Sequence, residues 1–507
     1  MAEFDDLLAG IRAHPADELR RLVFADWLDE NAGGDPLWSP WASYLRWAVA
    51  AVRTPRTDPD YWKYRRYPEE PPHGLSRFLG IEGQPGHFEW LCGFPDILSL
   101  DVDTLHAHDW RLATLPGPLR RLTVYARDHP TIPQPDSSPA TPLPPVATDW
   151  VAGPTVARAG ALDVYMNYLD APAVLAALAA RAGSLPPLSL TLSVAAPEVA
   201  TALTESPFPS LVGLSVLNLH EPEQLAESGN LRGVKSFAAS GRPAESGRYR
   251  RLAERLPGLT RLALGEAVQA AFLMALVDGC SPGLTHLEAR ALTHDSPGWA
   301  AFAASPAFAR LERLSWSGGG SDDTTAGVWP AGLSEPEPAG LILNANYLPS
   351  GRTLALFASP MLNRCSCLFA TGCGLTADAY LALAENPAAR NLNVLSIQRP
   401  FKSNPICTGT VMEAFARSPH LAGLTELSLT FHSITDDDFE ELLTAPFADG
   451  LRYLNLAGNY FSEHVLERLT DPDTLPELTW LDIHKPTNGS PRLEPAFQKR
   501  FGPNFVF

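Results

Sequence analysis

Two aspartates lie at the end of a predicted hydrophobic strand, where their carboxylates could take part in phosphoryl transfer. They are Asp101 and Asp103, in the stretch LSLDVDTL, residues 98–105. A hydrophobic strand that ends in D-x-D can offer one carboxylate as a nucleophile toward phosphorus and the other as an acid and base, with Mg²⁺ between them. Phosphoryl transfer is therefore the first reaction to weigh against the rest of the sequence.

The same stretch is similar to the D-x-D-x-T opening of haloacid-dehalogenase-like phosphatases, with Leu105 where threonine or valine is usual. That resemblance implies an enzyme whose site is formed by Asp101 and Asp103. The alternating strands and helices expected downstream follow a leucine pattern instead, and the phosphate-binding, zinc-protease and nucleophile-elbow motifs are absent. We expect a protein that is not an enzyme and has no catalytic residues. An enzyme with this or an otherwise unrecognised site is the alternative.

Metal binding is the second chemistry that the residue types suggest. Cys365, Cys367 and Cys373 cluster in CSCLFATGC, and His106 and His108 stand in HAHDW. Zinc sites usually combine C-x-x-C pairs with a second pair or with histidines, and neither cluster has this spacing. We expect buried apolar cysteines, no metal and no small-molecule cofactor.

Composition limits the possible partners and compartment. The chain has 507 residues, a hydrophobic fraction of 45%, a net charge of −18 and six cysteines. An acidic chain is a poor phosphate binder, so we expect no nucleic acid partner. The N-terminus lacks the basic end and apolar core of a secretory signal, and no apolar run reaches the length of a membrane span. We expect a cytoplasmic protein that does not bind membranes.

A leucine frame recurs through most of the chain. The stretch LRYLNLAGN, residues 451–459, reads L-x-x-L-x-L-x-x-N, and the frames around it are spaced evenly (451 − 424 = 27 and 478 − 451 = 27). Self-similarity at a fixed period of this length indicates a repeat architecture. The six best frames begin at Leu259, Leu284, Leu311, Leu424, Leu451 and Leu478.

Each strand-like frame is followed by a helix-like segment. In ITDDDFEELLTAPF, Thr435 and the acids after it suit a helix N-terminus, and GLTADAYLALAENP at 374–387 has the same design. One strand and one helix per unit resembles the leucine-rich repeat, nearest to the long type of ribonuclease inhibitors. The resemblance implies an α/β fold, a curved solenoid with parallel strands on its concave face and helices on its convex face.

The N-terminal segment predicts a small helical module. One apolar run at helical spacing contains Phe4, Leu7, Leu8 and Ile11. After the His14-Pro15 break, a second run contains Leu19, Leu22, Val23 and Trp27. The sequence of residues 7–33 resembles the bacterial repeat-companion domain, a module that precedes repeat arrays and has no established molecular function. The residues that carry the resemblance are Arg12, Pro15, Arg21, Leu22, Ala25, Asp26, Trp27 and Leu28, and Arg46 matches a later family position.

These patterns divide the chain into three parts. We expect the helical repeat-companion module at 1–52, a connecting segment at 53–92 and the solenoid at 93–507. Proline-rich and glycine-rich stretches predict loop insertions near 129–149 and 317–340. The C-terminal stretch near 493–507 is expected to cap the last repeat. The connecting segment includes YWKYRRYPEEPP from Tyr61, read as a tether or a stacking site.

The predicted function is protein binding on the concave face, where side chains between the fixed leucines point outward. The alternating frame places Tyr453 and Trp480 side by side on adjacent strands, as exposed interface anchors or as aromatics covered by the C-terminal cap. The acidic balance predicts a protein partner with a basic face. The expected partner-binding residues are Glu312, Arg313, Glu426, Ser428, Arg452, Tyr453, Asn455, Trp480, Asp482 and His484.

Overall fold

The fold is taken from a computed structural model of the whole chain. The structure describes residues 3, 6–7, 10–11, 17–31, 38–53, 86–91, 94–103, 105–107, 119, 121–126, 148–166, 171–193, 197–219, 222–241, 246–265, 269–290, 301–302, 304–317, 340–399, 409–483, 491–501 and 505–506.

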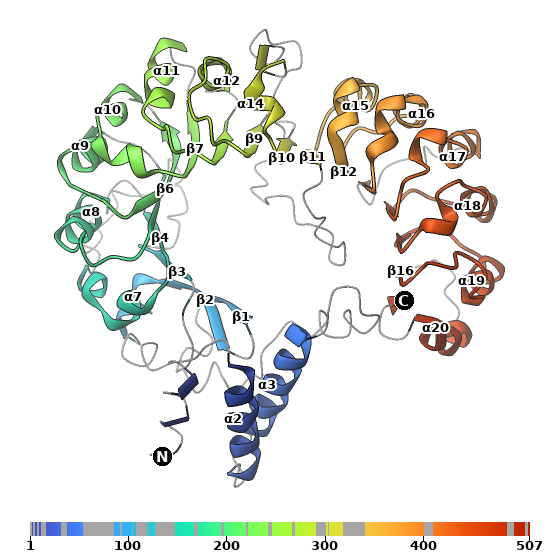
Figure 1. Ribbon diagram of the computed structural model, residues 1–507, viewed down its shortest axis with the longest axis horizontal. Coiled ribbons are helices and arrows are strands. Elements are labelled where there is room, and N and C mark those ends of the chain that lie inside the picture. The colour runs from blue at the N-terminus through green and yellow to red at the C-terminus, as the bar shows by residue number, and fades with distance from the viewer. Residues whose placement is uncertain are drawn as a thin grey trace, which may run out of the picture. The chain divides into compact units, whose positions relative to one another are not determined.

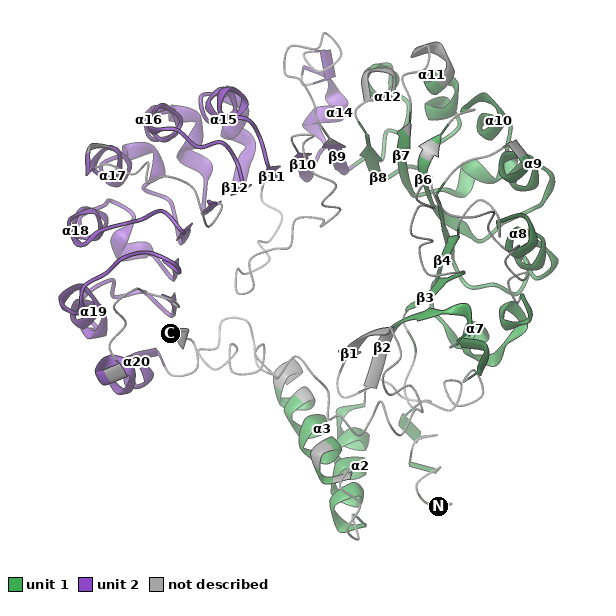
Figure 2. Ribbon diagram, turned by 180° about the vertical axis from the view of Figure 1, so that it is seen from behind, with its two compact units in different colours: residues 1–55, 64–284 green, residues 56–63, 285–507 purple. Residues whose placement is uncertain are grey.

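The chain folds as an α/β leucine-rich repeat solenoid whose described residues form two compact units, coloured separately in Figure 2. Among the described residues, unit 1 runs to Leu284 and unit 2 starts at Thr285. Within each unit the strands line the inner side of an arc and the helices lie on its outer side (Figure 1).

Unit 1 contains a parallel ladder from β2 to β8. Its strands are β2 (Phe94–Asp101), β3 (Arg121–Tyr125), β4 (Leu162–Met166), β5 (Leu188–Leu192), β6 (Leu211–Leu219), β7 (Ser236–Gly241) and β8 (Arg261–Leu264). Its helices are α2 (Glu18–Glu30), α3 (Trp38–Arg53), η1 (Asp149–Ala152), α7 (Pro154–Arg158), α8 (Ala171–Ala180), α9 (Pro197–Glu205), α10 (Pro222–Ala226), η2 (Gly229–Gly233), α11 (Ser246–Glu254) and α12 (Gln269–Val277).

Unit 2 contains a second parallel ladder from β9 to β17. Its strands are β9 (His286–Arg290), β10 (Arg313–Ser317), β11 (Leu341–Asn346), β12 (Cys365–Thr371), β13 (Val394–Gln398), β14 (Glu426–Thr430), β15 (Tyr453–Asn455), β16 (Trp480–Asp482) and β17 (Phe505–Val506). Its helices are α14 (Pro306–Ala309), α15 (Ser350–Phe357), η4 (Pro360–Arg364), α16 (Ala377–Glu385), η5 (Pro387–Asn391), α17 (Gly409–Ala416), η6 (Pro419–Leu421), α18 (Asp436–Leu443), η7 (Ala448–Gly450), α19 (Glu463–Thr470), η8 (Pro491–Leu493) and α20 (Glu494–Phe501).

The leucine frame sets the register of the ladder. Leu427, Leu454 and Leu481 pair across β14, β15 and β16, and each is buried against the helix layer. A single strand and helix cannot bury their apolar faces alone, so each repeat contributes one layer to a continuous core. The predicted helix start at Thr435 is confirmed, because Thr435 and Asp438 form a capping box at the start of α18.

A second ladder of small polar side chains ties together the helix ends of neighbouring repeats. Ser228, Ser281 and Ser418 each donate an Oγ hydrogen bond to a carbonyl at a helix end of the preceding repeat. The Asn386 Nδ2 likewise donates hydrogen bonds, to Phe357 O at 2.8 Å and to Ser359 O at 3.0 Å. These bonds satisfy buried carbonyls that the helices leave without partners.

The N-terminal module is a helix pair, but its buried face differs from the predicted one. Phe24, Ala25 and Leu28 pack with Trp41 on α3, whereas Leu19 and Val23 are exposed. The prediction is therefore wrong for Leu19 and Val23, whereas Ile11 is part of this core and Leu7 and Trp27 pack against it. With 3.6 residues per turn, a shift of one residue rotates the buried face by about 100°, which accounts for the two exposed positions.

Three predicted boundaries compare with the structure as follows. The connecting segment contains a strand, β1 (Gly86–Leu91), which pairs antiparallel with β2. Most of both predicted loop insertions and the stretch from Tyr61 lie outside the described residues. At the C-terminus, α20 and β17 extend the ladder beyond β16.

Candidate functional site

The predicted aromatic pair on β15 and β16 is stacked but not exposed. Tyr453 and Trp480 lie in register, with ring centroids 4.1 Å apart and an interplanar angle of 5°. Their adjacency is therefore confirmed. Each is only 3% exposed, so of the two predicted alternatives the exposed anchors are wrong, and burial of the pair agrees with covered aromatics.

Tyr453 and Trp480 are buried because the outward side chains around them on neighbouring strands are also largely apolar. Tyr453 and Trp480 belong to one apolar cluster on unit 2, and every residue of β14, β15 and β16 is buried. The leucine frame cannot reveal this, because it fixes only the inward residues. The other cluster members, on β11, β12 and β13, are Ile342, Cys367, Phe369 and Val394.

The remaining predicted contact residues divide into buried and exposed groups. Arg452 and Glu312 are exposed and Arg313 is half-buried. His484 lies outside the described residues. The polar members that are buried in the ladder, contrary to the outward-facing prediction, are Glu426, Ser428, Asn455 and Asp482.

Unit 1 presents a different strand face, and the sequence frame did not identify it. Tyr125 and Tyr165 lie in register on β3 and β4, with ring centroids 4.9 Å apart. Tyr165 is 40% exposed, in contrast to the buried aromatics of unit 2. We call the in-register row that contains them the tyrosine row. It consists of Asp101, Tyr125, Tyr165, Thr191, Ser215, Ala238 and Ala263.

Charges flank the two tyrosines. Asp101 lies beside Tyr125 in the row, and Asp163 lies on β4, where it pairs with Arg121 at 3.4 Å. Burial, together with Tyr165 and Asp163, raises the pKa of Tyr125 above its ordinary value, so its phenol stays neutral and can donate a hydrogen bond. The arrangement offers two aromatic faces next to carboxylates.

The sequence carries a signal for this row. In LRRLTVY and in LDVYM a tyrosine follows the last apolar residue of the frame, at Tyr125 and Tyr165. Extending each frame by one residue and comparing equivalent positions would have brought the two tyrosines together. In the neighbouring outward row, Ser189, Gly213 and Ser236 are small, and at Gly213 an added Cβ would lie 2.6 Å from Ser189 Oγ.

The residues considered for chemistry are separated by the fold. Asp101 lies at the end of β2, in the tyrosine row, whereas Asp103 is exposed in the helical segment that follows. His106 contacts Asp149 at 3.2 Å, and His108 lies outside the described residues. Among the described residues no group of three or more metal-ligating side chains comes together.

The clustered cysteines are buried thiols, as predicted. Burial raises the pKa of Cys365 to about 12 and those of Cys367 and Cys373 to about 11. Such thiols are protonated at neutral pH and are poor nucleophiles and metal ligands. Cys373 occupies the position that Asn459 has in its own repeat, and its Sγ donates to Ala345 O at 3.3 Å.

His432 takes that same position in the repeat of β14. Its Nδ1 lies 2.8 Å from Thr430 O and its Nε2 lies 2.6 Å from Tyr380 Oη. The ring is fully buried, and this burial lowers its pKa from 6.5 to about 3. The His432 imidazole is therefore neutral in the folded protein at neutral pH.

We expect acid to destabilise unit 2 through His432. In the unfolded chain His432 takes up a proton near pH 6.5, and in the folded chain only near pH 3. The stability that the neutral His432 contributes to folding is therefore complete above pH 6.5 and declines as pH falls. By pH 4 the loss is about 3 kcal/mol, at up to about 1.4 kcal/mol per pH unit. Urea unfolding between pH 7 and pH 4 measures it. His432→Gln should show a smaller dependence, and equal slopes would contradict the assignment.

No described helix is long and apolar enough to span a membrane. No protein-family profile and no curated protein matches the chain. The solved structures similar to it include two at 14% identity. One is the TLR13–ssRNA13 complex, with a TM-score of 0.31 and coverage of 74% of this chain and 57% of that one. The other is the Rad7–Elc1 complex of yeast, with a TM-score of 0.32 and coverage of 74% and 78%. The assignment to the leucine-rich repeat fold rests on the strand register and helix layer described above.

Proposed function

We propose that this protein is a non-catalytic scaffold that binds a protein partner through the strand face of unit 1. The observation that carries the proposal is the stacked, partly exposed pair Tyr125 and Tyr165 on a regular ladder. Tyrosines supply large, rigid contact area at low entropic cost, and small neighbours such as Thr191 and Ser215 leave room for hydrogen bonds. Aromatic residues of this kind are frequent anchors of protein interfaces.

The charges favour a partner with a basic contact group. A lysine or arginine side chain can lie over a tyrosine ring and reach a carboxylate at the same time. Asp101 and Asp163 supply carboxylates near Tyr125 and Tyr165, and the net charge of −18 acts in the same direction over a longer range. This keeps the predicted partner class and moves its binding surface from unit 2 to unit 1.

The N-terminal helix pair fits a supporting role within the same proposal. Arg46 on α3 pairs with Asp26 at 2.7 Å and with Asp29 at 2.5 Å on α2, which fixes the two helices together. Its resemblance to the bacterial repeat-companion domain supports a bacterial scaffold, and a cytoplasmic location is part of the proposal. Either it caps the first repeat or, with Asp26 and Trp27, it forms a second docking site.

In unit 2, the exposed members of the predicted set are candidates for a further partner contact. These are Arg452 and Glu312, with half-buried Arg313 beside Glu312 in sequence. Charged side chains at the rim of an interface chiefly set orientation and association rate. We therefore assign them a secondary contribution.

We expect Tyr165→Ala to weaken partner capture at least tenfold without unfolding the chain, because Tyr165 is 40% exposed. A tagged full-length protein is used for pull-down from native extract, and bound proteins are quantified by mass spectrometry. Tyr460→Ala is the matched control, since Tyr460 is 52% exposed but lies in unit 2. A partner retained by the control and lost from Tyr165→Ala supports the proposal.

Equal retention by both variants would overturn the assignment of the surface. Nuclease treatment before elution separates a protein partner from a nucleic acid one. If capture by the wild type depends on intact RNA or DNA, the partner class is wrong. A Lys- or Arg-rich contact should also weaken as salt rises, because exposed charge interactions are screened over about 10 Å at 0.1 M.

A further inference from the structure

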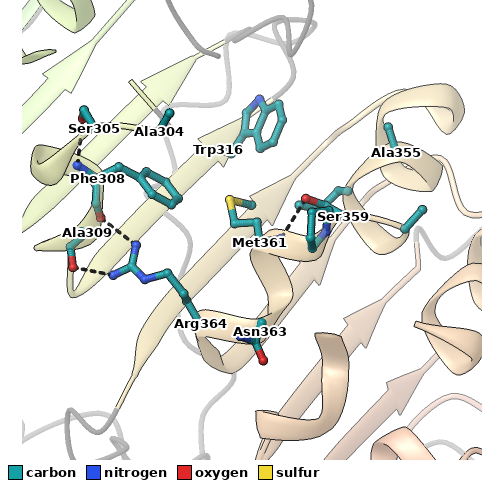
Figure 3. Close-up of a pocket in the computed structure, with 13 residues that line it drawn as sticks. Ala304, Ser305, Phe308, Ala309, Trp316, Ala355, Ser359, Met361, Asn363 and Arg364 are labelled. Atoms are coloured by element: carbon teal, nitrogen blue, oxygen red, sulfur yellow. Dashed lines mark hydrogen bonds between the residues drawn. The ribbon is translucent and has the colours of Figure 1, made fainter. Parts of the chain in front are cut away.

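A cavity of about 660 Å³ lies on the helix side of unit 2, between α14 and the segment formed by α15 and η4 (Figure 3). On its two sides, α14 spans four residues and α15 spans eight. Trp316, on the core side of β10, is part of the cavity lining.

The cavity wall is mostly apolar. Phe308 of α14, Trp316 of β10 and Met361 of η4 line it (Figure 3). Leu356 of α15 is also part of the lining. Small side chains leave the space between them open, and no acidic residue is part of the described lining. The small residues are Ala304, Ala309, Ala355 and Ala358. A volume of this size suits a small ligand with one apolar body.

One cationic side chain, Arg364, lies at this apolar wall. The Arg364 guanidinium donates from Nη1 to Phe308 O at 2.7 Å and from Nη2 to Ala309 O at 2.8 Å and Leu311 O at 3.3 Å. It lies 5.0 Å from the centre of the Phe308 ring. Within the described chain it forms no ion pair, so three carbonyls hold the charge in place without neutralising it. None of these bonds uses its Nε–H.

We propose that this cavity binds an amphipathic carboxylic acid, with its apolar chain against Trp316 and Met361 and its carboxylate at Arg364. An anion at a fixed guanidinium gains a charge-assisted hydrogen bond that a neutral alcohol of the same length lacks. The site is independent of the strand face of unit 1, and its ligand is a small molecule and not a protein.

Titration of the full chain with decanoate, below its micelle concentration, tests the proposal. Methyl ¹³C signals of the five methionines report binding, and Met361→Leu assigns the cavity signal. Decanoate should shift the Met361 signal and bind at least tenfold more tightly than decan-1-ol. Arg364→Gln should remove that difference between the two ligands.

Arg364→Gln also removes the hydrogen bonds of Arg364 to the carbonyls at the end of α14, so it could change the fold there. A pair of matched substitutions that keeps Arg364 therefore tests the cavity independently. Ala358→Trp fills the cavity from the C-cap of α15, and Ala422→Trp adds the same bulk at the C-cap of η6; both alanines are exposed and have αR backbone. Decanoate binding should be lost only in Ala358→Trp.

Four results would overturn the proposal. The first three are no binding of decanoate, equal affinity for decan-1-ol, and equal binding by the two tryptophan variants. The fourth is binding that appears only after residues 318–339 are replaced by a glycine-serine linker, since the ligand of the cavity would then be a segment of this chain.

Discussion

Asn459→Ala is expected to lower the free energy of unfolding by about 4 kcal/mol. The Asn459 side chain is 1% exposed and makes four hydrogen bonds. Its Oδ1 accepts from the amides of His432 at 2.9 Å and Ile434 at 3.1 Å, and its Nδ2 donates to Leu429 O and Leu456 O at 2.8 Å each. Each buried group that loses its partner costs about 1–3 kcal/mol, and partial relaxation reduces the sum.

Asn455→Ala is the matched control in the same repeat. Asn455 is also buried, but the hydrogen bond of its side chain in the described structure is a single one, with Oδ1 accepting from Ala457 N at 3.0 Å. Its loss should cost about 1 kcal/mol. Urea unfolding of the full chain, followed by circular dichroism and tryptophan fluorescence, measures both. Similar losses for the two variants would show that the four bonds do not act as a unit.

Trp480→Ala is expected to cost about 4 kcal/mol, through loss of a buried aromatic side chain and the cavity that remains. The indole is 3% exposed and stacks on Tyr453, so truncation also removes an aromatic pair. The variant should therefore change stability first, and any effect on binding would follow from unfolding.

Two further variants distinguish this structural role from a role as a surface anchor. Trp480→Phe keeps an aromatic ring in the stack and should cost less than half as much as Trp480→Ala. Tyr460→Ala, at a side chain that is 52% exposed, should change stability by less than about 0.5 kcal/mol. A Trp480→Ala protein with wild-type stability and lost partner binding would restore the original prediction of an exposed anchor.

The sequence predicted the elements that repeat. Leucines at a fixed spacing require a common inward face, and Thr435 followed by acids requires a helix start, so both follow from local chemistry. The turn at Asn459 was also predictable in kind. In the structure Cys373 and His432 occupy the equivalent position, which explains why one frame can end in three different residue types.

The outward residues could not be placed in the same way. Tyr453 and Tyr165 both occupy outward positions of strands in leucine-type frames, yet the first is 3% and the second 40% exposed. Burial of an outward side chain depends on tertiary packing across the ladder, which a repeat period does not encode. The exposed face of Leu19 on α2 shows the same limit, since an apolar stripe alone could not determine which side packs against α3.

Photo-crosslinking through the tyrosine row tests the central claim most directly. A benzoylphenylalanine residue at position 165 is compared with one at position 460 in the full chain within its own cells, and adducts are identified by mass spectrometry. We predict a specific protein adduct from position 165 that is absent from position 460 and that includes lysine- or arginine-rich peptides. Adducts from position 460 alone, or the same adducts from both positions, would contradict binding through the strand face of unit 1.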